Sequence, residues 1–410
     1  DGPLGLDDAG ILIMQGGLLR IQGNASADTI EQINLLRVVT AGGRIELQPH
    51  GSRGLDLNLG NFSVPNNSGS LVIAGIDGRD SGPGIAALTV DGILPYQIGQ
   101  GSGSMNGARD LPVRGDILAD ASRTGLGTGF LVMDSVTGAF RALSALELQT
   151  DLAQLQIEEN FGLTGTLTFG ADLRMNTLTS TVGTRSLASS LNPTVFGAYG
   201  PGGSLLDLGL TGASAVLVPS GSTTTLGAGS LTTEGTAYFH VLGTGTLDLN
   251  ASVGVGDSAS FVKAGAGRLN LNRRAYFAPL SLRNGFTVEE SDELTVDSTA
   301  GVSIGSLVTG PGIPGSTFVT EIISSARVRI SSGEGVTTSG PGTYLLQPIV
   351  SVNGGQLFLN SGFANTFAVA ALPGPAGLSA LFVNTSDSLV DLMGQDQAIG
   401  TLGSVNFLPG

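Results

Sequence analysis

The sequence predicts an all-β protein wound as a parallel β-helix, a solenoid of short strands stacked coil upon coil. Three observations support this fold: 65 of the 410 residues are glycine, only 12% are charged, and short alternating apolar segments recur along the chain. Strict alternation marks a strand with one buried face, and glycine between such strands supplies the turns. Each strand buries its face and pairs its edges by stacking on similar strands.

The alternating segments appear from one end of the sequence to the other, separated by glycine or asparagine. We expect strands within residues 17–23, 43–47, 54–60, 69–73, 163–169, 243–250, 261–272, 354–360 and 388–394. Their spacing is irregular, which excludes a strict hexapeptide or nonapeptide array. Tandem β-sandwiches and a propeller are the alternatives, but aromatic residues are only 5%, tryptophan is absent, and no blade-length period is visible.

The most informative segment covers residues 261–272. Its marked positions are Phe261, Lys263, Gly265, Gly267, Leu269 and Leu271. Two glycines form a turn, and the leucines that follow alternate as in a half-buried strand. Residues 243–250 repeat the pattern, so we expect the two segments to stack in neighbouring coils. Lys263 is the only lysine in the chain; it is either a cross-link donor to an Asn or Asp or, as we favour, a corner residue of the repeat.

Two regions depart from the alternating pattern and set the expected domains. Residues 138–160 contain few glycines and have apolar residues at helical spacing, which predicts a short helical decoration. Residues 294–347 form a self-contained block whose Pro-Gly-Ile-Pro-Gly turn would break a regular coil. The expected organisation is therefore a solenoid over 1–293, an inserted small β-module over 294–347, and a continuation of the solenoid over 348–410.

These motifs resemble the bacterial autotransporter-associated β-strand repeat proteins. The marked positions of segment 261–272 match the repeat one by one, although residues 273–277 depart from it and predict a different corner. Residues 391–402 are similar to a recurrent Gly-x-x-Gln-x-Ile-Gly-x-Leu strand, and residues 127–143 and 294–347 resemble other parts of such proteins. The resemblance implies a right-handed β-helix, export by a Gram-negative-type bacterium, and a structural or adhesive role without a defined ligand.

Composition excludes several classes of function. A formal net charge of −15 argues against nucleic acid and anionic lipid as partners. The absence of cysteine removes thiol catalysis and Cys-based metal sites. No apolar run is long enough for a membrane-spanning helix. His50 and His240 lie far apart in sequence, and because a solenoid coil contacts only its neighbours we do not expect them to meet.

The remaining candidate sites are weak. Asp77 and Asp80 lie in a glycine-rich turn with oxygen ligands for calcium, but they lack the spacing of known calcium loops. The densest acidic cluster, residues 289–293, is the candidate for a polysaccharide-cleaving site through Glu289, Glu290 and Asp292; we favour a solvated loop. Asp7-Asp8 and Glu158-Glu159 are further acid pairs. We expect no catalytic residues and no cofactor.

The expected function follows from shape and length. The sequence does not begin with Met and has no signal peptide, so we expect a processed end or an internal piece of a longer chain. Neither end has an evident capping helix, which favours axial stacking. We expect an extracellular fibre subunit or segment on a bacterial surface, whose partner is itself. The alternative is an adhesin stalk that binds a surface glycan through the inserted module; a polysaccharide-active enzyme is the third hypothesis.

Overall fold

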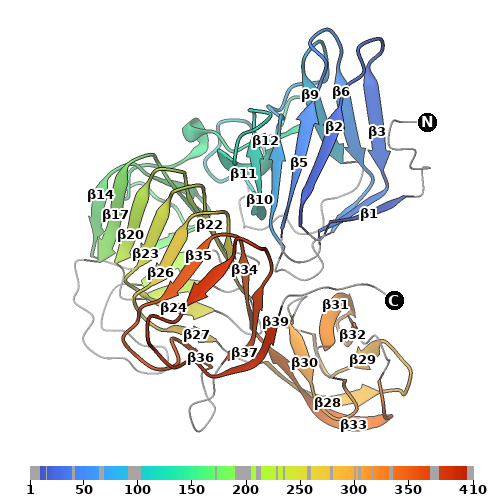
Figure 1. Ribbon diagram of the computed structural model, residues 1–410, viewed down its shortest axis with the longest axis vertical. Helices are drawn as coiled ribbons and strands as arrows, with labels where there is room; N and C mark the ends of the chain where they lie inside the picture. The colour runs from blue at the N-terminus through green and yellow to red at the C-terminus, as the bar shows by residue number, and fades with distance from the viewer. Residues whose placement is uncertain are drawn as a thin grey trace.

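In the residues that the structure describes, the fold is built from β-strands and one 3-10 turn. The computed structural model describes residues 10–14, 16–38, 42–63, 69–90, 103–170, 173–189, 205–208, 214–227, 230–233, 236–255, 260–277, 280–299, 302, 306–314, 317–331, 336–369 and 378–403. Parallel sheets stacked in register, with an inserted six-stranded antiparallel barrel, confirm the prediction of an all-β solenoid carrying a small β-module. Figure 1 shows the whole chain.

The first nine strands form a small solenoid, called here the first stack. They are β1 (Ile11–Met14), β2 (Leu18–Gln22), β3 (Thr29–Ile33), β4 (Leu35–Val38), β5 (Gly43–Gln48), β6 (Leu55–Leu59), β7 (Phe62–Ser63), β8 (Leu71–Ala74) and β9 (Ala86–Val90). Each coil contributes one strand to each of three parallel sheets, β1-β4-β7, β2-β5-β8 and β3-β6-β9. In β6 the buried positions alternate with half-buried ones, as the sequence predicts.

Three strands, each antiparallel to the next, follow the first stack and form the meander. They are β10 (Arg114–Asp120), β11 (Gly129–Met133) and β12 (Phe140–Ala142), and β10 continues a sheet of the first stack by pairing in parallel with β8. Every residue of β10 is buried because both faces are covered. Ile117 packs on the core of the first stack, and Leu118 packs on a separate cluster shared with the second stack.

The larger solenoid, the second stack, occupies most of the remaining chain. Its strands are β13 (Asn160–Leu163), β14 (Thr166–Phe169), β15 (Leu173–Met175), β16 (Thr177–Ser180), β17 (Thr184–Ser189), β18 (Leu205–Leu208), β19 (Ser214–Val218), β20 (Thr223–Gly227), β21 (Ser230–Thr233), β22 (Ala237–Val241), β23 (Thr246–Leu249), β24 (Ser252–Val255), β25 (Phe261–Ala264), β26 (Arg268–Leu271), β27 (Ala275–Phe277), β34 (Ile349–Asn353), β35 (Gln356–Leu359), β36 (Phe367–Val369), β37 (Leu378–Val383), β38 (Leu389–Asp391) and β39 (Ile399–Gly403). They form parallel sheets of eight, seven and six strands around one apolar core.

The two similar sequence segments are neighbours in this stack, as predicted. Strand β23 pairs in parallel with β26, so that Leu247 lies beside Leu269 and Leu249 beside Leu271. All four leucines are buried in the same core. The single solenoid expected over 1–293 is, however, divided: the meander separates the first stack from the second, because β11 and β12 reverse direction instead of starting a new coil.

The region expected to be helical, residues 138–160, contains only the 3-10 turn Ala145–Glu147 and a series of tight turns. Side chains of Gln149 and Asp151 accept hydrogen bonds from nearby backbone N–H groups, which favours turns over a continuing helix. Leu152 and Leu155 pack against the apolar core of the second stack. The segment therefore covers the first coil of that stack.

The inserted module is a closed antiparallel barrel. Its strands are β28 (Leu280–Thr287), β29 (Glu293–Thr295), β30 (Leu307–Thr309), β31 (Thr317–Ser324), β32 (Arg327–Ile330) and β33 (Gly340–Gln347), in the order β28-β29-β32-β31-β30-β33. It begins at Leu280, upstream of the expected boundary at 294. Because β28 pairs with β33, the chain returns beside the point where it left, and β34 pairs directly with β25.

The faces of the second stack differ in what covers them. The meander packs on the outer face of the eight-stranded sheet, and the barrel packs farther along the same face through Phe318, which lies 5.9 Å from the Phe382 ring. The outer face of the seven-stranded sheet, which includes β14, β17 and β20 in Figure 1, is solvent-facing, with exposed Thr166, Thr184 and Thr223.

Candidate functional site

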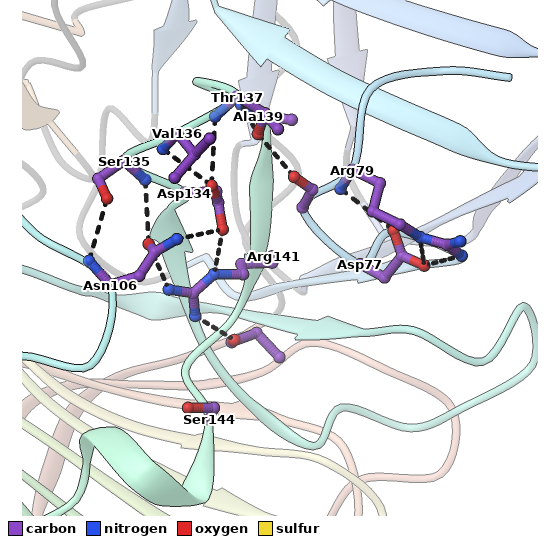
Figure 2. A network of polar contacts seen from close by, with 12 residues as sticks. Asp77, Arg79, Asn106, Asp134, Ser135, Val136, Thr137, Ala139, Arg141 and Ser144 are labelled. Carbon is purple, nitrogen blue, oxygen red and sulfur yellow. Dashed lines mark hydrogen bonds and ion pairs between the residues drawn. The ribbon is translucent and has the colours of Figure 1, made fainter.

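A network of hydrogen bonds and ion pairs surrounds Arg141 on β12 (Figure 2). Its guanidinium donates to Glu147 Oε1 at 2.6 Å and Oε2 at 2.8 Å, to Asp134 Oδ2 at 3.0 Å, and to the side-chain oxygen of Asn106 at 2.9 Å. A fifth bond reaches the Ala142 carbonyl at 3.1 Å. One arginine therefore joins the turns on either side of β12 to a loop that lies 35 residues away in sequence.

The two carboxylates of this network are held in their charged form. Burial alone would raise the pKa of Glu147, but hydrogen bonds from Arg141 and from the backbone N–H groups of Gly107 and Ser144 lower it to about 2. Burial acts in the same way on Asp134, and bonds from Asn106, from backbone N–H groups and from Arg141 lower its pKa to about 2. Such shifts are typical of carboxylates with several donors.

A hollow of about 480 Å³ opens beside this network. Ile76, Ala142 and Leu146 contribute apolar lining, and Arg141 and Glu147 contribute polar lining. The guanidinium and the carboxylate already bind each other. The network therefore positions loops and offers no free charge of its own to a ligand.

The calcium candidate lies on the rim of the same hollow. The Asp77 carboxylate is ion-paired with the Arg79 guanidinium, whose Nε donates at 2.8 Å, and this side-chain bond lowers the pKa of Asp77. Asp80 is exposed. In the part of the chain that the structure describes, no group of three His, Cys, Asp or Glu side chains is placed to hold a metal ion. A guanidinium on Asp77 also opposes a second cation there.

Lys263 lies on β25, just before the corner at Gly265, and is buried inside the second stack. Its ammonium donates to the carbonyl oxygen of Gly265 and, at 2.6 Å, to that of Gly354. Burial lowers the pKa of Lys263 to about 7, against an opposing effect of Asp387. Because the barrel is inserted between β27 and β34, the bond to Gly354 ties together coils that the insertion separates in sequence. This geometry agrees with the corner role; the two bonds described lead to carbonyl oxygens rather than to an Asn or Asp side chain.

The glycines of the repeat are required by the close approach of the neighbouring coil. Gly265 has φ +79°, and a Cβ there would lie 2.5 Å from the Val241 carbonyl oxygen. A Cβ on Gly267 would lie 2.6 Å from the Gly245 carbonyl oxygen. Phe261, Leu269 and Leu271 point into the core. The motif thus specifies one coil of the wall.

A buried lysine gives a direct chemical test of this placement. An amine-reactive ester at pH 8 is expected to leave Lys263 unmodified in the native protein, because the side chain has no exposed surface despite its lowered pKa. In urea the same residue should react fully, which peptide mass spectrometry would measure. Rapid labelling of the native protein would contradict the buried corner position.

The two histidines have different surroundings. His50 is exposed in a turn, where its Nδ1 lies 3.0 Å from the Ser52 hydroxyl. His240 is buried on β22, and its Nε2 lies 2.8 Å from the carbonyl oxygen of Gly115 on β10. Its partner is thus a distant strand of the meander, which the rule of neighbouring coils did not predict.

The acidic cluster of residues 289–293 lies on the barrel. Glu289 and Glu290 are exposed, and Glu290 adopts the left-handed backbone region at φ 63°. Asp292 and Glu293 form ion pairs with Arg329, at 3.3 Å and 3.7 Å. These contacts pair the cluster with barrel arginines in the manner of a solvated surface. The acid pair Asp7-Asp8 lies outside the described residues.

The network around Arg141 was not predicted from the sequence. Glu147 and Asp134 lie six and seven residues from Arg141 and could have been paired with it, but Asn106 lies 35 residues away with no local signal. In the described residues, no helix has the length and apolar character needed to cross a membrane. Comparison with protein-family models, with curated proteins and with solved structures gives no match for this chain.

Proposed function

We propose that the protein is an extracellular structural protein, a subunit or segment of a bacterial surface fibre, related to the autotransporter-associated β-strand repeat proteins. The observation that supports this proposal is the regular parallel pairing of strands from coil to coil within each of the two stacks, in sheets of up to eight strands. Function then lies in length and in the presentation of surfaces. The proposed partner is another solenoid coil, from a second copy or from the same chain, and the proposed location is the cell surface.

The strands at the edges of the two stacks support the proposal that another solenoid coil binds there. Strand β1 is an edge of the first stack and β39 an edge of the second, and neither has a further neighbour among the described strands. Both carry exposed apolar side chains: Ile11 is 60% exposed and Leu402 is 69% exposed. Unpaired edges with apolar side chains are templates for pairing with another strand. On β36, by contrast, the Gln397 side chain binds both the N–H and the carbonyl of Phe367 and so occupies that edge.

Negative-stain microscopy and sedimentation over a concentration series test the proposal. We expect filaments or end-to-end chains, and Leu402→Lys should shorten them because a charge blocks the edge. Val182→Lys is the matched control, since Val182 is 67% exposed at a corner away from β39. Dispersed single particles at every concentration, or equal assembly by both variants, would contradict assembly through this edge.

A second proposed function, adhesion through the barrel, rests on one observation. Phe286 and Val288 are exposed by 45% and 52% at the end of β28, beside the acidic turn. Exposed apolar side chains on a protruding module are typical of contact surfaces. Replacing both by serine should reduce binding to glycan-coated surfaces while leaving the circular dichroism of the solenoid unchanged. Unchanged binding would exclude this role for the barrel.

A further inference from the structure

The joint between the meander and the second stack is a buried cluster of polar and aromatic groups. On β10, Arg114 donates two bonds to Asp116, at 2.8 Å and 2.6 Å, and the two side chains are 5% and 1% exposed. On β22, Tyr238 and His240 face this strand from the outer side of the eight-stranded sheet. Apolar residues such as Leu118 and Phe130 pack around these groups, and Asn160 on β13 donates to the carbonyl oxygens of Arg109 and Leu111. A change of charge here therefore acts on the contact between the two parts of the molecule.

His240 is held at this joint as a neutral ring. Because the Gly115 carbonyl can only accept, the proton of the neutral imidazole must lie on Nε2. The ring stacks on Tyr238 at 6.1 Å and meets the edge of Phe130 at 6.0 Å. The one bond of the ring among the described residues is made through Nε2. A second proton, on Nδ1, would place a positive charge on a ring that is only 2% exposed, where the charged form is poorly solvated.

The surrounding charges do not compensate such a proton. Asp116 is the nearest acid, but both of its oxygens bind Arg114. Tyr238 on β22 is neutral, since burial raises its pKa well above the usual value. Lys263 on β25 opposes protonation, and β11 and β19 supply no titratable side chain to the cluster. Burial lowers the pKa of His240 to about 4, despite the opposing effects of the Gly115 carbonyl and Asp116.

We propose that His240 makes the joint acid-labile: a proton on Nδ1 detaches the meander, together with the first stack, from the outer face of the eight-stranded sheet. The apolar core of the second stack lies on the inner face of that sheet and does not include the joint. Loss of the outer contact therefore leaves the second stack folded. The device acts on the relative position of the two stacks and is independent of whether the protein forms fibres.

The pH window follows from the sign of the shift. A histidine whose folded pKa is below the unfolded value of 6.5 contributes stability that is complete above pH 6.5 and is lost as the pH falls toward 4. The carboxylates of Asp134 and Glu147 stay charged in this window, because their pKa values are about 2. The shift corresponds to an equilibrium change of about 300-fold, or about 3 kcal/mol.

Small-angle scattering and hydrogen exchange of the full chain at pH 7.5 and pH 4.5 test the proposal. We expect a larger maximum dimension at pH 4.5 and a loss of amide protection in β10 and β22 of up to about 75-fold, because pH 4.5 lies above the folded pKa and only part of the 300-fold change is reached. His240→Gln keeps a donor toward Gly115 and cannot take the proton, and His240→Phe keeps the ring shape; both should remain compact at pH 4.5. His50→Asn, the control, should respond like the wild type.

Two outcomes would overturn the proposal: an unchanged dimension and protection of the wild type at pH 4.5, or an equal response of His240→Gln. If His240→Phe does not fold, the glutamine variant and the nitrogen chemical shifts of the wild-type ring keep the test complete. A ring that stays the Nε2–H tautomer down to pH 5 and then gains a proton as protection falls would support it. Protonation without loss of protection would refute it.

Discussion

Replacing Asp116 by asparagine is expected to lower the free energy of unfolding by about 3–5 kcal/mol, because it removes the carboxylate charge that binds the buried Arg114 guanidinium. Both side chains are almost completely buried, and the carboxylate accepts two bonds from the guanidinium. The loss should appear in urea unfolding at pH 7.5. In hydrogen exchange, the loss of amide protection should appear first in β10 and in β22, the strand on which β10 packs.

A matched variant separates the ion pair from the space it occupies. Replacing both partners, Arg114→Met together with Asp116→Leu, should cost far less than the single change, because no buried charge remains. Two results would show that the ion pair does not stabilise the joint. One is a loss of unfolding free energy below about 1 kcal/mol in Asp116→Asn; the other is a double variant that is as unstable as Asp116→Asn.

The strands of both stacks could be predicted because their information is local. The alternation at Leu269 and Leu271 and its repeat at Leu247 and Leu249 indicate inward-facing strands, and the structure places them side by side. Glycine at 265 marks a corner because the neighbouring coil leaves no space for a Cβ. Repetition thus predicts the coil and its immediate neighbour.

The joint and the network could not be predicted, because their contacts are not local. His240 and Gly115 are 125 residues apart, and in β10 burial on both faces removes the alternation that would mark its orientation. The neighbour rule holds within a stack, where each strand pairs with the next coil, but it does not describe how one stack packs on another. Asp134 likewise meets Asn106 only because two loops converge on Arg141.

The second large loss of stability is expected from a change at Phe261, which lies in the core of the second stack and in the segment 261–272. Phe261 packs at 4.8 Å from the ring of Phe239 in the previous coil and at 5.7 Å from Phe367 in the next. Phe261→Ala should lower the free energy of unfolding by about 3–5 kcal/mol, since it removes buried area and leaves a cavity between rigid coils. Urea unfolding would measure the loss.

The position of that loss is as informative as its size. In a solenoid each coil contacts only its neighbours, so protection should fall most in β22, β25 and β34 and least in the barrel, which has its own core. Phe286→Ala is the matched control: its ring is 45% exposed on the barrel, and the change should alter the free energy of unfolding by about 0.5 kcal/mol or less.

The same variant, Phe261→Ala, should also expose Lys263. Strand β34 pairs with β25, because the barrel returns the chain beside the point where it left. Separating these two strands would break the hydrogen bond from Lys263 to the Gly354 carbonyl. Labelling of Lys263 should therefore accelerate in Phe261→Ala and stay slow in Phe286→Ala; equal rates would contradict the coupling of the core to the corner.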